Sequence, residues 1–425
     1  MQLKTFFRLA SGVGAITVMN QALVLVLGIV LARWLGVEGY GTYAFVMSVV
    51  VLLLILARLG LPNLLMREIA AGRGEVVDWV WRSGSLVFGA SVLLVLVVTF
   101  VTLALELDPA MQVALLVGLW LLPLLGFLEV VSHALLGMRQ PIFSELIRAL
   151  LPALLTLSVA GILAWQTPDN ASAALAGRLG AIFCTVIVAG AFLRWSMGAP
   201  SFQTTASTPT LGTIVRKGLP FMLIEGGARI MSSTDVVMLG LLLGPSEVGI
   251  YNVALQGALL VQLILSTANK IVAPEFSRLH ADGDMRALER FAISTTRATI
   301  AVAFPIMVIL VIYGEALLGL AFGQEFSTAS EVLSMLAIGF VVVLFFGEPG
   351  FMLNMTGYED LTLRVYLAAG VLNIALNFIL IPTLGASGAA LSTLTTLLLQ
   401  RIITWWLVRK RLGISIGFLG RGLRI

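Results

Sequence analysis

Apolar stretches of roughly twenty residues recur along this chain, separated by short polar connections. An α-helix rises about 1.5 Å per residue, so each stretch is long enough to cross the ~30 Å hydrocarbon core of a bilayer. The pattern predicts an all-α integral membrane protein with about twelve transmembrane helices. The predicted spans are Gly12–Ala32, Thr42–Leu65, Ser83–Leu105, Gln112–Leu136, Ile142–Leu163, Ala173–Leu193, Leu219–Leu243, Ile250–Val272, Thr296–Phe322, Ser330–Leu353, Leu361–Ile381 and Ala386–Val408.

The cationic residues concentrate in alternate connections between these spans. One set contains Lys4 and Arg8 and ends in the basic run from Arg409 to Arg411, whereas the other set contains Arg33 and several acids. Because Lys and Arg are enriched in cytoplasmic connections, we predict that both termini are cytoplasmic and that the number of spans is even. The low share of charged residues, 11%, against 59% hydrophobic residues agrees with a membrane protein.

Sequence signatures of soluble enzymes are missing. The chain contains no GxxxxGK[ST] phosphate loop, and its two histidines, His133 and His280, lack metal-ligand spacing to other donors. We therefore predict that the protein is not an enzyme and has no cofactor or metal. The net charge of +4 comes from residues beside the membrane, which indicates anionic lipids as partners and not nucleic acid. The single cysteine, Cys184, excludes an intramolecular disulfide.

One local pattern recurs in both halves of the chain. The sequence LGVEGYGTY over 35–43 matches LGPSEVGIY over 243–251 as LGxxxxGxY, an offset of 243 − 35 = 208 residues. A weaker match pairs Leu136-Gly137 with Thr356-Gly357. Six spans return the chain to its starting side, so the pattern predicts a parallel repeat of two six-helix bundles. The expected division is an N-terminal bundle (1–197), a Ser/Thr/Pro-rich linker (198–214), a C-terminal bundle (215–408) and a basic interfacial tail (409–425).

Ionisable residues inside predicted spans are candidates for function, because such groups are costly in hydrocarbon and normally face a cavity or a partner. Depth along the helices places several cations in the cytoplasmic half, which predicts a cationic vestibule open to the cytosol. Each candidate also has a purely structural explanation. Lys270 could extend its ammonium group to the membrane interface, and Glu225 and Arg229 could neutralise each other. The other candidates could form ion pairs or hydrogen bonds between helices. Glu129 and His133 also form an i, i+4 pair. The intramembrane candidates that we carry forward are Arg58, Arg229 and Lys270 for a substrate and Asp235, Glu225 and Glu348 for a proton or cation.

Two segments resemble the polysaccharide transporter family, the Wzx-type flippases of lipid-linked oligosaccharides in the MATE-like exporter superfamily. They are RWLGVEGYGTYA over 33–44, with LGL at 59–61 and REIA at 67–70, and DVVMLGLLLGPSEVGIYNVA over 235–254. The matched positions include the ionisable residues Arg33, Arg67 and Asp235, and with this resemblance Arg33 and Arg67 join the residues predicted to bind the substrate. The resemblance implies a MATE-like fold of two facing bundles and a place in the bacterial inner membrane.

The same resemblance implies a function. Such a protein moves undecaprenyl-diphosphate-linked glycan repeat units from the inner to the outer leaflet by alternating access, coupled to an H⁺ or Na⁺ gradient, for O-antigen, capsule or exopolysaccharide synthesis. Its partners would be the lipid-linked glycan, membrane lipids and membrane proteins of polysaccharide assembly. Arginines suit a diphosphate because guanidinium groups bind phosphate oxygens well. The alternative is a MATE-type exporter of small molecules or drugs, for which we expect an acidic, aromatic cavity.

Overall fold

The computed structural model describes residues 3–72, 75–104, 108–163, 170–197, 210–418 and 420. Within these residues, side chains are described except at 3–13, 223–225, 227–232, 263–271, 273–274 and 277. The regular elements in the described residues are all helical, as the apolar pattern predicts. The chain divides into two compact units, Met1–Arg229 and Ile230–Ile425, with the boundary inside helix α9 (Leu211–Leu242). Most of the predicted linker over 198–214 lies outside the described residues.

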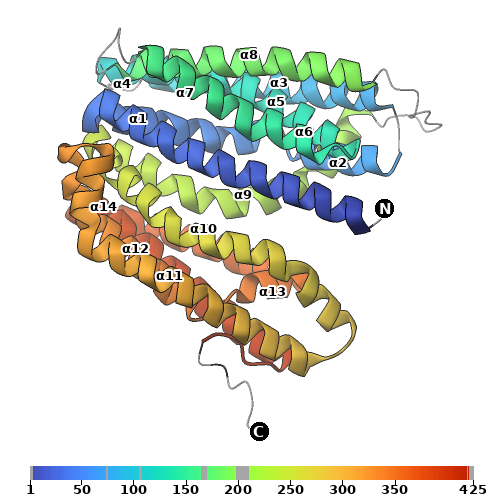
Figure 1. Cartoon of the computed structure of the whole chain (residues 1–425). Helices are drawn as coiled ribbons and strands as arrows, with labels where there is room; N and C mark the ends of the chain where they lie inside the picture. Colours follow the sequence, from blue (N-terminus) through green and yellow to red (C-terminus); the bar gives the residue numbers. More distant parts are fainter. Residues whose placement is uncertain are drawn as a thin grey trace. The chain divides into compact units, whose positions relative to one another are not determined.

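The first unit is built mainly from long helices that pack side by side (Figure 1). Helix α1 runs away from the N-terminus and folds back toward α2, and α5 contacts α1, α2, α3 and α8. Before the boundary inside α9, its elements are α1 (Leu3–Arg58), α2 (Leu61–Ala70), α3 (Val76–Ala104), α4 (Pro109–Leu119), α5 (Leu121–Gly137), α6 (Pro141–Glu145), the π-helix η1 (Leu146–Leu150), α7 (Leu151–Leu163) and α8 (Ala171–Met197).

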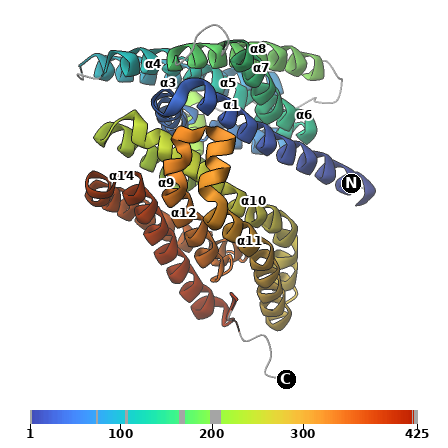
Figure 2. The same cartoon turned by 60° about the vertical axis from the view of Figure 1, so that its left-hand side comes forward.

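The second unit begins in the last turns of α9. Helices α10, α11 and α12 pack against one another in this unit (Figure 2), and α14 contacts α10, α12 and α13. After α9, its elements are α10 (Pro245–Ala281), α11 (Met285–Phe322), the 3₁₀-helix η2 (Gln324–Ala329), α12 (Ser330–Leu344), α13 (Pro349–Met355) and α14 (Glu359–Leu412).

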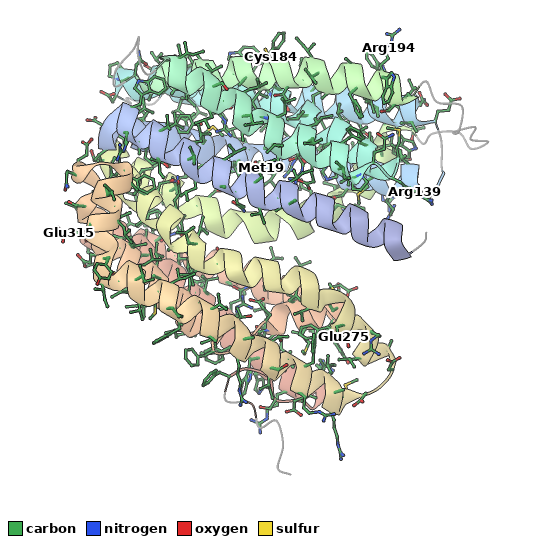
Figure 3. All side chains as sticks on the ribbon, in the orientation of Figure 1. Met19, Arg139, Cys184, Arg194, Glu275 and Glu315 are labelled. Carbon is green, nitrogen blue, oxygen red and sulfur yellow. The ribbon has the colours of Figure 1, made fainter. Side chains whose placement is uncertain are left out.

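The surface of both units is rich in exposed apolar side chains. Trp81, Phe100 and Leu320 each expose about three quarters of their area, at 76%, 74% and 76%. Large exposed apolar patches mark membrane contact, and eight helical segments of the described chain are long and apolar enough to cross a bilayer. Cys184, which lies on the exposed side of α8 (Figure 3), belongs to this surface. The protein is therefore a multi-pass membrane protein, while the count of twelve spans stays a prediction.

Two of the eight helices are interrupted by glycine. Helix α1 has a non-helical residue at Gly36 (φ 62°, ψ −175°), and α14 has one at Gly385 (φ 58°, ψ −137°). This region of backbone space is essentially restricted to glycine. The two breaks fall between predicted spans one and two and between spans eleven and twelve. At 54 residues, α14 would extend about 80 Å if it were straight, far more than one bilayer crossing needs.

Other predicted spans are broken where the sequence analysis expected one continuous helix. Span two does not reach Leu65, because Leu59 (φ 50°) and Gly60 (φ 68°) leave the helical region and Pro62 starts α2. Span four divides at Trp120, where Pro123 cannot donate to the preceding turn. Span five contains the π-helical segment just before Pro152. Span ten ends at Leu344 and is followed by a separate helix that starts at Pro349.

The glycine turns explain the internal repeat. Gly244, the partner of Gly36 in the LGxxxxGxY pattern, has nearly the same backbone conformation, with φ 94° and ψ −179°. The two copies thus share a conformation that any side chain would disfavour. The weaker match is out of register, because the left-handed residue after α5 is Arg139 (φ 62°), whereas after α13 it is Gly357 (φ 85°). The residue after each of these, Gln140 or Tyr358, donates its backbone N–H to the carbonyl five residues before it, at 2.9 Å.

The C-terminal segment over 413–418 packs against the second unit. The Ser415 backbone N–H donates to Glu289 Oε1 at 2.9 Å, and the Trp405 indole N–H donates to the Ile416 carbonyl at 2.8 Å. The Phe418 backbone N–H donates to the Phe345 carbonyl, also at 2.8 Å. Ile416 is 3% exposed and belongs to a core cluster. The predicted basic tail is therefore helical up to Leu412, and the segment that follows it, over 413–418, packs on the second unit. Residues 421–425 lie outside the described residues.

Candidate functional site

A buried carboxyl group, Asp235, lies at the centre of a polar cluster in the second unit. Asp235 of α9 is 1% exposed. Its Oδ2 accepts hydrogen bonds from the Tyr251 hydroxyl of α10 at 2.9 Å and from the Thr393 hydroxyl of α14. Its Oδ1 accepts from Asn377 Nδ2 at 2.6 Å, and Asn377 donates in turn to Asn373 Oδ1 at 3.3 Å. Three helices meet at one acidic side chain.

The kink in α14 brings together the hydrogen-bond partners that this helix supplies to Asp235. Asn377 precedes Gly385 and Thr393 follows it, so both arms of the helix reach Asp235 only because the chain reverses at the glycine. Glu247, from the second copy of the glycine motif, stabilises the reversal, because its Oε2 accepts the Ala386 backbone N–H at 2.8 Å. A backbone N–H near the start of a helical arm is one of the donors that helix geometry leaves without a partner. The motif therefore shapes the site through Glu247 and also contributes to it directly, because its last residue is Tyr251.

Oxygen atoms dominate the chemistry of this cluster. Asn377 Oδ1 and Asn373 Nδ2 are buried and have no hydrogen-bond partner among the described residues. Amide oxygen and nitrogen are assigned from the hydrogen-bond network, and a flip of Asn377 would turn its free oxygen toward Asp235. The carboxyl, amide and hydroxyl oxygens would then converge. Such a set suits either a proton on Asp235 or a hard cation such as Na⁺.

A second buried pair joins Glu348 and Arg401. Glu348 precedes α13, and its Oε1 accepts from Arg401 Nη2 of α14 at 2.5 Å. Both side chains are largely buried, with exposures of 13% and 15%. A small cavity of about 30 Å³, lined by Glu348 and by Thr295, Thr296 and Thr299 of α11, lies beside the pair. This volume suffices for a water molecule.

A third cluster lies in the first unit. Arg58, the last residue of α1, is 3% exposed, and its Nη1 lies 3.4 Å from Glu129 Oε2 of α5. His133 Nδ1 lies 3.4 Å from the same carboxylate oxygen, one turn farther along α5. No acid lies three or four residues from Arg58 in its own helix, and its partner Glu129 comes 71 residues later in the sequence (129 − 58). Only the tertiary fold brings these charges together.

The two remaining candidate cations with described side chains, Arg33 and Arg67, lie at the surface. Arg33 of α1 is exposed. Arg67 of α2 exposes 52% of its side chain, contacts Glu68 Oε1 at 2.7 Å and lies over the Phe221 ring with 5.2 Å to its centroid. The side chains of Glu225, Arg229 and Lys270 lie outside the described residues. The predicted substrate and coupling residues are therefore spread over several places, and Asp235 and Glu348 have separate partners.

Interhelical partners were the functional features that sequence reasoning missed. Arg178 of α8 donates to the Tyr43 hydroxyl of α1 at 2.6 Å. Arg148, by contrast, has a local partner, because it contacts Glu145, three residues earlier in the chain, at 2.7 Å. Asn373 and Asn377 lie inside predicted span eleven, where nothing in the sequence identifies Asp235 as the partner of Asn377. Beyond the predicted spans, near the C-terminal end of α10, Arg278 donates to Glu275 (labelled in Figure 3) and lowers the pKa of that carboxyl group.

Solved structures of membrane transporters share the fold of this chain. An inward-facing MATE family multidrug transporter of the MOP superfamily superposes with a TM-score of 0.72 and 15% identity, covering 93% of this chain and 94% of the other. The lipid II flippase MurJ, in an inward closed conformation, superposes with a TM-score of 0.73 and 11% identity, covering 93% and 87%. The chain has the fold of MATE transporters and MurJ.

Residues 10–280 match the polysaccharide biosynthesis protein family, and the chain belongs to this family. A probable low-salt glycan biosynthesis flippase of Haloferax volcanii is 26% identical over 167 residues, which cover 39% of this chain and 35% of the relative. The teichuronic acid biosynthesis protein TuaB of Bacillus subtilis is 25% identical over 145 residues, covering 34% and 29%. These alignments span only about a third of each curated relative.

Proposed function

We propose that this protein is a flippase that translocates undecaprenyl-diphosphate-linked oligosaccharide repeat units from the inner to the outer leaflet, for surface polysaccharide synthesis. The family match over 10–280 carries the proposal. The similarity to named glycan flippases supports it, and the fold shared with MurJ agrees with it. In this proposal the protein lies in the bacterial inner membrane with both termini in the cytoplasm, and two six-helix halves alternate access to the leaflets.

Coupling to an ion gradient is part of the proposal, and Asp235 is the residue that we assign to it. Its burial, its position where three helices meet and its oxygen-rich surroundings support this role. Binding of H⁺ or Na⁺ would change the hydrogen bonds that join α9, α10 and both arms of α14. Glu225 and Glu348 were candidates for the same role, and the ion pair with Arg401 gives Glu348 a structural function as well.

The cationic residues would bind the diphosphate headgroup. Arg58 already holds the Glu129 carboxylate at 3.4 Å, so a phosphate would compete with that carboxylate for the guanidinium group. Such an exchange would couple headgroup binding to a rearrangement between α1 and α5. We propose that Arg229, Lys270, Arg67 and Arg33 contribute to the same electrostatic field.

The second candidate is a MATE-type exporter of small molecules, favoured by the superposition on a multidrug transporter. The discriminating experiment compares lipid-linked oligosaccharides in a strain that lacks this protein and in the same strain with the wild-type or Arg58→Ala protein restored. A flippase predicts that diphosphate-linked repeat units accumulate facing the cytoplasm and that only the wild type relieves the accumulation. Unchanged lipid-linked pools together with altered sensitivity to cationic drugs would favour the exporter.

A further inference from the structure

The two arms of α14 enclose a groove in the second unit. It has a volume of about 370 Å³ and lies between residues 364–372 on the outgoing arm and 396–403 on the returning arm. The walls are mainly apolar, and Ile403 remains 45% exposed. The residues used below are Arg364, Ala368, Leu372, Thr396, Gln400 and Ile403.

One end of this groove is lined and followed by positively charged side chains. Arg364 lies five residues from the start of α14, is exposed and forms no ion pair among the described residues. The returning arm ends in Arg409, Lys410 and Arg411. Because α14 reverses at Gly385, the start and the end of the helix lie on the same side of the membrane, and the groove opens at a cationic end.

Aromatic residues mark the same end as a membrane interface. Lys410 lies over the Trp406 ring, with 4.7 Å to its centroid, and Arg409 lies over Trp405 at 5.9 Å. Tryptophan is enriched at the level of lipid headgroups. From Arg364, the groove follows its helix to Leu372, a rise of about 12 Å. It therefore runs from the headgroup level into the hydrocarbon.

We propose that this groove binds one anionic phospholipid, with an acyl chain between the arms of α14 and the phosphate on Arg364. Gln400, which is 7% exposed and lines the wall, supplies a polar group for the ester region, below the headgroup level. A phosphodiester carries a single negative charge, which a single unpaired arginine balances. This lipid is a resident ligand and not the transported substrate, so the proposal does not depend on the proposed function.

The test uses the full-length protein purified in detergent and native mass spectrometry. Palmitoyl-oleoyl phosphatidylglycerol and phosphatidylcholine are titrated separately onto the wild type and its variants. Removal of one cation near the membrane surface should weaken binding of the anionic lipid about fivefold in Arg364→Gln. Arg364→Lys should keep the preference for phosphatidylglycerol, and Ala368→Trp, which fills the groove, should lose both lipids. Arg194→Gln is the matched control, because Arg194 (labelled in Figure 3) is an exposed arginine beside a tryptophan on α8 and is not among the residues that line the groove.

The proposal is wrong if Arg364→Gln and Arg194→Gln bind phosphatidylglycerol equally, or if Ala368→Trp binds both lipids like the wild type. It is also wrong if the species that co-purifies with the wild type and disappears in Ala368→Trp is a polyprenyl diphosphate. That last result would assign the groove to the transported lipid and would support the proposed flippase function.

Discussion

Substitution of Asp235 separates its structural role from its proposed role in ion coupling. In Asp235→Leu, three buried donors lose their acceptor, namely the Tyr251 and Thr393 hydroxyls and Asn377 Nδ2. Each buried donor without a partner costs about 1–3 kcal/mol, so the expected destabilisation is about 3 kcal/mol at the low end. A loss of this size is large against the marginal stability of a folded domain.

The Asp235→Asn substitution should destabilise the protein much less, because the side chains around residue 235 can rearrange their hydrogen bonds. The new amide can direct its oxygen at the two hydroxyl donors and its nitrogen toward Asn377. A flip of Asn377 then presents its Oδ1, which has no hydrogen-bond partner in the described part of the wild type, to the new donor. The main loss is the 3.3 Å hydrogen bond to Asn373, worth about 1 kcal/mol.

Thermal stability in detergent, read as the fraction that stays monodisperse after heating, measures this difference. We expect Asp235→Asn to stay close to the wild type and Asp235→Leu to aggregate at a clearly lower temperature. If Asp235→Asn also abolishes the dependence of transport on the ion gradient, the carboxyl group has the proposed coupling role. Equal stability of the Leu and Asn variants would refute the reasoning about the three donors.

The remaining predictions concern the glycine turn and the second buried pair. Gly244→Ala should destabilise the protein by about 1–3 kcal/mol because of its backbone conformation alone, since a Cβ there meets no atom of the described residues within 4 Å. Gly89→Ala, at an equally open but helical position, should be neutral or slightly stabilising, and equal melting of the two variants would contradict the argument. Arg401→Met should cost about 3 kcal/mol because it leaves Glu348 buried without its cation. The double variant with Glu348→Gln should recover part of that loss in the same melting assay, whereas strictly additive losses would show that the pair is not coupled.

Much of the architecture could be predicted from the sequence because the bilayer imposes a length on every helix. The apolar runs identify the helical segments, and the LGxxxxGxY repeat identifies Gly36 and Gly244, which share a backbone conformation restricted to glycine. The breaks near Leu59, Trp120 and Leu146 were missed because hydropathy is insensitive to proline and to local backbone geometry. A hydropathy window cannot distinguish a continuous span from two short helices that end inside it.

The candidate site was predictable only in part. An acid such as Asp235 is conspicuous in an apolar run, because an ionisable group in hydrocarbon is energetically costly and normally has a functional role or a partner. Its partners could not be assigned, because Tyr251, Asn377 and Thr393 come from three places in the sequence and meet only through the reversal at Gly385. The same reason explains why Arg58 looked unpaired, since Glu129 becomes its neighbour only when α1 and α5 pack together.

The central claim is best tested by reconstitution of the purified protein into liposomes that contain a labelled undecaprenyl-diphosphate-linked oligosaccharide. The measurement is the fraction of labelled glycan that a membrane-impermeant reagent can reach from outside, with and without an imposed H⁺ or Na⁺ gradient. A flippase predicts that this fraction rises above the protein-free level and rises faster with the gradient. An unchanged fraction, in vesicles where the same protein exports a cationic drug, would contradict the account.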